Sequence, residues 1–175
     1  MNKTFTALAT VAAVAIASPA HARSNHQAHV SLARAVERVG MTVYVNPSVC
    51  DEVNALGMYV PARKAVVICQ ENRIKGSTAV VRWTEEDYDT LRHEVHHVVQ
   101  DCRDTYLNGE LNAVYKNPIG LGVEWLGRDG AARVAQMYAR QGASDHIQVM
   151  EIEAFAVAAM NDPAEQERDI QNFCF

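Results

Sequence analysis

The chain has 175 residues, with 16 Lys and Arg against 21 Asp and Glu, and a formal net charge of −5. This mild acidity argues against nucleic-acid binding as the main role, because domains that bind nucleic acids carry a basic surface. The length suits one domain with its own core, and no apolar segment is long enough to span a membrane. The oligomeric state is left open.

The first 22 residues have the organisation of a secretory signal peptide. Lys3 gives a short positive region, residues 7–17 are largely apolar, and Ala20-His21-Ala22 matches an Ala-x-Ala cleavage site. The sequence therefore predicts a signal peptide over residues 1–22 and a single mature domain over residues 23–175. The mature protein is expected to be secreted or periplasmic.

Short elements are expected before the middle of the chain. Residues 24–29 are expected to be mobile, and an amphipathic helix is expected to end at Gly40. Strand composition and turn residues predict one strand and then a hairpin. The predicted segments are residues 30–39 for the helix, 42–46 for the strand, and 57–60 with 65–69 for the hairpin.

A helix is predicted from Thr84 to Cys102. Thr84 is a good N-cap, and three acidic residues follow it in the first turn, where they meet the positive end of the helix dipole. Apolar residues recur at helical spacing and predict one core-facing side, formed by Leu91, Val95, Val98, Val99 and Cys102.

The same helix contains the pentapeptide His93-Glu94-Val95-His96-His97. Side chains four apart on a helix point the same way, so His93 and His97 can bind one metal ion, and Glu94 can reach a water on that metal. Three histidines could instead form a solvated polar face, but this alternative does not explain the position of Glu94. His96 points away from the pair and is predicted to lie behind it or at the surface.

The second half of the chain is expected to be irregular at first and then helical. Residues 103–130 contain several Gly and Asn residues and are predicted to be irregular, before a helix over residues 131–141. The apolar, helical segment over residues 145–160 carries two carboxylates. A last short helix should follow Asp162-Pro163.

A catalytic zinc site usually takes three protein ligands, so one more is expected downstream. A buried carboxylate needs a cation or hydrogen-bond donors, and this singles out Glu151 and Glu153 within the apolar segment. The two lie about 200° apart around a helix, so only one can face the site. The other candidates for the third ligand are Glu110, Glu124 and His146.

Four cysteines are present, and an even number in an exported chain predicts two disulfides. Three pairings are possible. Cys50–Cys69 is favoured because it links adjacent strand ends, and Cys102–Cys174 because it ties the motif helix to the C-terminus. The spacings lack a Cys-x-x-Cys signature, which argues against thiolate zinc ligands.

With these motifs the chain resembles the zincin metallopeptidases of the gluzincin type. In that group a His-Glu-x-x-His helix is completed by a glutamate on a later helix. Compact members carry a Glu-x-Glu-Ala segment whose first glutamate is the ligand, so the resemblance to Glu151-Ile152-Glu153-Ala154 implies Glu151. Phe155 stands where some related families have Asp or Asn, so a polar contact made there is expected to be absent.

The resemblance implies an α+β, zincin-like fold, with a small β-sheet packed on the motif helix and on a second, glutamate-bearing helix. It also implies a Zn²⁺-dependent peptidase that acts on peptide or protein substrates, with His93, His97 and Glu151 as metal ligands and Glu94 as general base. Two interpretations of residues 58–60 and 65–68 are open: one of these strands offers an exposed sheet edge to which the substrate adds, or both strands merely cover the core.

Two alternatives remain open from the sequence. One is a zinc hydrolase with the same ligands that acts on a non-peptide amide or ester. The other is a secreted metal-binding or interaction module without turnover. The donor that would stabilise an oxyanion beside the metal is unassigned, with Tyr106, Tyr115, Tyr138 and His146 as candidates.

Overall fold

The computed structural model describes residues 8–11, 26–104 and 106–175. This part of the chain forms an α+β fold with a small sheet and five α-helices. The strands are β1 (Leu8–Val11), β2 (Thr42–Val45), β3 (Ala55–Val60) and β4 (Ala65–Ile68). The helices are α1 (His26–Arg38), α2 (Glu85–Cys102), α3 (Pro118–Arg140), α4 (Asp145–Met160) and α5 (Pro163–Cys174).

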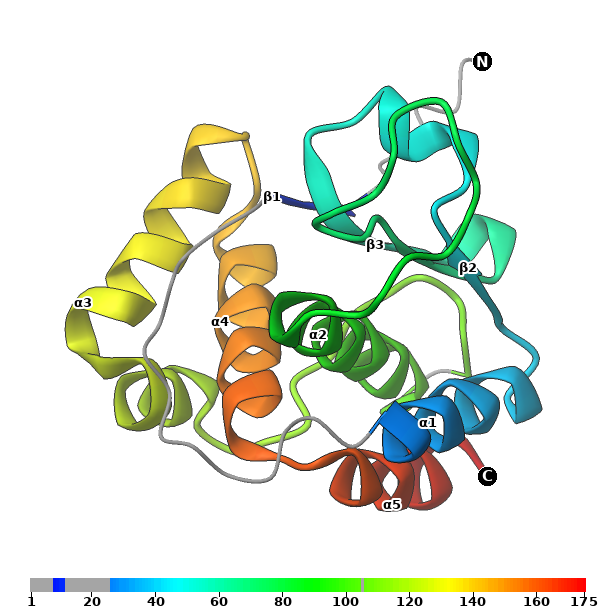
Figure 1. Ribbon diagram of the computed structural model, residues 1–175. Coiled ribbons are helices and arrows are strands. Elements are labelled where there is room, and N and C mark those ends of the chain that lie inside the picture. Colours follow the sequence, from blue (N-terminus) through cyan, green and yellow to red (C-terminus); the bar gives the residue numbers. More distant parts are fainter. Residues whose placement is uncertain (1–7, 12–25, 105) are drawn as a thin grey trace, which may run out of the picture.

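Helix α2 lies at the centre of the molecule (Figure 1). The sheet covers one side of it, α4 a second, and α1 with α5 a third, while α3 packs on the outside of α4. The predicted apolar stripe is confirmed, because all five of its residues belong to the main core cluster. The opposite side of α2 is also buried, including His93, His96 and His97, so these histidines do not form a solvated face.

The sheet has the order β1-β3-β4-β2. The predicted strand and hairpin are confirmed: β3 and β4 are antiparallel, and β2 pairs with β4 in parallel. Because β4 lies between β3 and β2, the expectation that residues 65–68 offer a free edge is wrong. The outer edge of β3 pairs with Leu8–Val11 in antiparallel register, with Thr10 opposite Gly57.

The leader prediction falls largely outside the described residues. Of residues 1–22 the structure describes only 8–11, the strand on the outer edge of β3. The same holds for residues 24 and 25 of the stretch expected to be mobile. The remainder of that stretch is helical, so the expected start of the first helix at Val30 is wrong, and α1 begins at His26.

Helix α1 starts early because a polar residue in its first turns is buried. His29 is 2 % exposed, stacks on the Tyr88 ring at a centroid distance of 4.2 Å, and places Nε2 2.8 Å from Arg92 Nη1. A hydrophobic pattern counts only apolar residues and therefore begins this helix at Val30.

The predicted irregular region is confirmed for residues 103, 104 and 106–117. It is wrong for residues 118–130, because α3 begins at Pro118. The side chain of Asn117 caps the helix by accepting from the Gly120 amide, and Pro118 occupies the first turn. One of the glycines of α3 has a packing role: a Cβ on Gly122 would lie 2.2 Å from Ile152 Cγ2 on α4. Only at Gly127 does the helix kink, at φ 72°.

The other helix predictions and both disulfides are confirmed. The segment that carries Glu151 and Glu153 is α4, and the helix after Asp162 is α5. Cys50 pairs with Cys69, and Cys102 at the end of α2 pairs with Cys174 at the end of α5. Among the described residues, no helix combines the length and the apolar character needed to cross a membrane.

Candidate metal centre

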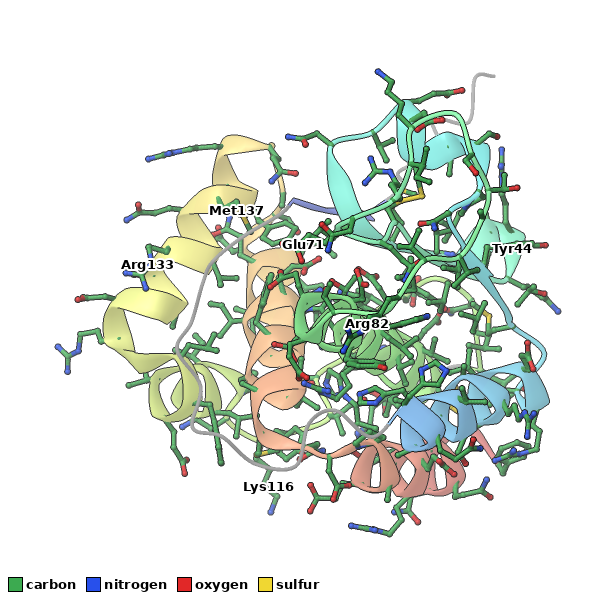
Figure 2. The ribbon with its side chains drawn as sticks, viewed as in Figure 1. Tyr44, Glu71, Arg82, Lys116, Arg133 and Met137 are labelled. Carbon is green, nitrogen blue, oxygen red and sulfur yellow. A yellow bond between two sulfur atoms is a disulfide. The ribbon has the colours of Figure 1, made fainter. Side chains whose placement is uncertain are left out.

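The start of α2 is fixed by a predicted cap that also ties it to the sheet. Thr84 Oγ1 accepts from the Asp87 amide, and the Asp87 carboxylate accepts from the Thr84 amide. The same carboxylate accepts from the backbone amide of Glu71 at 2.8 Å and from the side chain of Gln70 at 3.3 Å. Figure 2 shows Glu71 beside the first turns of the helix, while Arg133 on α3 points away from the molecule.

Two helices then bring three ligand atoms together. His93 and His97 lie one turn apart on α2, with their Nε2 atoms 3.1 Å from each other. Glu151 on α4 places Oε2 3.1 Å from His93 Nε2 and 3.5 Å from His97 Nε2. All three residues are at most 2 % exposed. In the described part of the chain this is the one group of His, Cys, Asp and Glu arranged to hold a metal ion.

These distances fit a tetrahedral cation. Zinc bonds of about 2.0–2.1 Å to nitrogen and oxygen place ligand atoms roughly 3.3 Å apart at tetrahedral angles. The three separations bracket that value, and two neutral imidazoles with one carboxylate are a common catalytic zinc set. The group can therefore hold a metal ion, and three ligands leave a fourth position open.

The electrostatics of the group favour a cation. Burial lowers the pKa of His93 to about 4. Burial is the largest effect on His97 and lowers its pKa, but the charge and hydrogen bond of Glu151, with smaller contributions from Glu94 and Gln100, together raise that pKa to about 9. Burial raises the pKa of Glu151, yet the charge on His97 and hydrogen bonds from both imidazoles bring it well below its usual range. A metal that binds at neutral pH must therefore displace a proton from His97.

Glu94 is fully buried beside this group, under strand β3. Its carboxylate contributes to the raised pKa of His97, after the larger effect of Glu151, which places its charge near the ligands. The strand approaches it at Gly57, where a Cβ would lie 2.5 Å from Glu94 Oε1 and 2.6 Å from Thr90 Cγ2. A glycine is thus required at this point of β3.

We expect Gly57→Ala to displace Glu94 without disturbing the three ligands. Metal binding should stay within about twofold. If Glu94 acts as the general base expected from the sequence, hydrolysis should fall at least tenfold, because proton transfer depends on the position of the base. Gly130→Ala is the matched control, since its Cβ would meet only Leu126 and Arg133 on α3. Equal activity of the two variants, each measured per folded molecule, would show that the position of Glu94 does not matter.

The second glutamate of α4 has a different role. Glu153 is fully buried and accepts from His96 Nε2 at 2.9 Å, so His96 is an internal partner and not a surface residue. Glu153 also accepts from the backbone amides of Val114 and Tyr115. It therefore holds the segment between α2 and α3.

The two ligand histidines differ in their second nitrogens. His97 Nδ1 lies 2.7 Å from Gln100 Oε1, a contact that the sequence analysis missed although Gln100 follows His97 by three positions on the same helix. His93 Nδ1 has no hydrogen-bond partner among the described residues. The Phe155 ring lies 4.3 Å from the His93 ring, centroid to centroid.

Several other candidates are engaged elsewhere. His146 Nε2 lies 2.7 Å from the carbonyl oxygen of Leu111, and the exposed Tyr106 donates to Val39. The Tyr115 hydroxyl is hydrogen-bonded to Asn161. Neither Glu110, Glu124 nor His146 belongs to the ligand group.

Comparison with known proteins places the chain in a family. A family described as a domain of unknown function (DUF8637) matches residues 22–175. The chain belongs to this family. No curated protein and no solved structure gave a significant match. The matched range contains every residue of the candidate metal centre.

Proposed function

We propose that this family member is an exported, zinc-dependent peptidase of the zincin type. His93, His97 and Glu151 would hold the zinc ion, and Glu94 would act as general base. The observation that carries the proposal is the convergence of three buried ligand atoms 3.1–3.5 Å apart, with a fully buried glutamate on the same helix. A merely structural cluster has no need for a carboxylate beside the ligands.

The chemistry supplied by zinc in such a site is a lowered pKa of bound water and a polarised substrate carbonyl. The chain contributes the proton transfers. Glu94 takes the proton of the attacking water and delivers it to the departing amine. Its burial keeps bulk water away, and the contact with Gly57 holds it in place.

The outer edge of β3 is the proposed place for the substrate. This edge already accepts an extended segment in antiparallel register at Leu8–Val11, and its Gly57 lies directly over Glu94. A peptide added there as a strand would run past the base. Release of the predicted leader would leave this edge available. The disulfides agree with an oxidising compartment, as expected for a secreted or periplasmic protein.

The test is made on the mature chain, residues 23–175. We expect one equivalent of zinc per chain and cleavage of a mixed peptide library, lost with a chelator and restored by zinc. Zinc binding without cleavage of any peptide would indicate the binding module, and cleavage of esters or non-peptide amides alone would indicate the other hydrolase. A protein that binds no divalent metal would overturn the proposal.

A further inference from the structure

We propose that Gln100 is a positioning residue, which fixes the tautomer and ring orientation of His97 so that Nε2 faces the metal. Glu153 in turn fixes the orientation of the Gln100 amide. The inference rests on the proposed metal binding by His93, His97 and Glu151. It adds a hydrogen-bond chain from Glu153 through Gln100 that orients the ligand His97.

The direction of the hydrogen bonds can be established from Glu153. Its Oε1 accepts from the Val114 amide at 2.9 Å, and its Oε2 from the Tyr115 amide at 3.2 Å. A backbone N–H can only donate, so both oxygens of Glu153 are acceptors. Gln100 reaches Oε1 at 3.2 Å and must therefore present its NH₂ group there.

A second acceptor requires the same orientation of the amide. Gln100 Nε2 donates to the carbonyl of Met150 at 3.0 Å. The amide oxygen of Gln100 is then turned toward His97 Nδ1, 2.7 Å away. An amide oxygen only accepts, so Nδ1 carries the ring proton of neutral His97, and Nε2, 3.5 Å from Glu151 Oε2, has its lone pair free for a metal shared with that carboxylate.

This hydrogen-bond chain reaches only one of the two imidazoles, that of His97. His93 has no hydrogen-bond partner at Nδ1 within the described residues, and its ring packs against Phe155. Glu153 could instead serve only to hold the segment at Val114. Its hydrogen bond to Gln100, and through Gln100 to the ligand His97, would then have no consequence for metal binding. The two readings therefore differ in what happens when Gln100 is changed.

The experiment compares Gln100→Met with the parent. Methionine has a similar length but no oxygen to accept from Nδ1. Zinc affinity, measured by competition with a chromogenic chelator, should fall about 10- to 100-fold. Gln166→Met is the matched control, because Gln166 is 1 % exposed and donates to the backbone carbonyl of Arg92 at 2.9 Å, not to a ligand side chain. Its zinc affinity should stay within about twofold of the parent.

Gln100→Glu serves as the rescue variant. It keeps an oxygen that can accept from His97 Nδ1, and a proton shared with Glu153 would limit the repulsion between the two carboxyl groups. We expect its zinc affinity to lie clearly above that of Gln100→Met. Equal zinc affinity of Gln100→Met and the parent would overturn the proposal, and so would equal losses in Gln100→Met and Gln166→Met.

A measurement on the zinc-loaded parent needs no variant to fold. The His97 Nδ1 proton should give a downfield, slowly exchanging NMR signal, shifted further than the His93 Nδ1 proton, which has no acceptor. The reverse order would overturn the proposal. A parent that binds no zinc would instead refute the metal centre itself, so the two failures are distinguishable.

Discussion

Glu94→Gln should leave zinc binding unchanged and lower kcat/KM on peptides by roughly 10²- to 10⁴-fold, the usual contribution of a general base. Glutamine has the same shape, so the contact with Gly57 and the packing of the fully buried side chain are retained. What is lost is the ability to accept a proton from water and pass it to the leaving amine. The measurement is steady-state hydrolysis together with metal analysis of the same samples.

The matched control for this variant is Glu86→Gln. Glu86 lies two turns earlier on α2, is only partly buried, and is not a member of the ligand group. The Glu86→Gln substitution removes the same charge from the same helix. The activity of this variant should stay within about twofold of the parent. If Glu94→Gln hydrolysed peptides as fast as this control, another group would have to be the base.

Local sequence signals predicted the bounds of α2 and the face that carries its ligand histidines. The bounds of α2 follow from the capping residue Thr84 and the acidic residues after it, and the structure contains this cap with Asp87. The periodicity of the helix places His93 and His97 on one face. The disulfide pairings rested on neighbouring strand ends and on the link between α2 and the C-terminus, and both are present.

Predictions from the sequence are wrong where long-range contacts decide the structure. The glycines of residues 118–130 suggested irregular backbone, although one of them, Gly122, lies where α3 approaches α4 closely. The glycine of β3, Gly57, could be recognised as a point of close approach, but not that Glu94 lies beneath it. Gln100 was within reach of a spacing argument, whereas its bonds to Glu153 and Met150 join different helices and depend on the packing of α4 on α2.

Substitution of the two glutamates of α4 should have opposite consequences for metal binding and for folding. Glu151→Ala removes a charged ligand, and we expect zinc affinity to fall on the order of 10³-fold. A charged ligand contributes a substantial part of the free energy of zinc binding at such a site. Glu153→Ala should lower zinc affinity by less than about 100-fold, because it acts only through Gln100, which keeps its bond to the Met150 carbonyl. Isothermal titration with zinc measures both.

The unfolding of the metal-free protein should rank the two variants the other way. The partners of Glu151 are His93 and His97, which can give up their protons, so no unpaired charge remains after its removal. Glu153 is bonded to the Val114 and Tyr115 amides, which cannot deprotonate. Its removal takes the acceptor from these part-buried amides and from the buried Gln100 side chain, and should cost about 3–5 kcal/mol in urea unfolding.

The combination of the two measurements decides which glutamate is the ligand. A residue that matters for metal affinity but little for metal-free stability is a ligand, because its partners in the folded chain are titratable and the metal is its main counter-charge. A residue with the opposite profile belongs to the framework that holds the segment between α2 and α3. If Glu153→Ala abolished zinc binding while Glu151→Ala preserved it, the third ligand would be Glu153, against the 3.1 Å approach of Glu151 to His93.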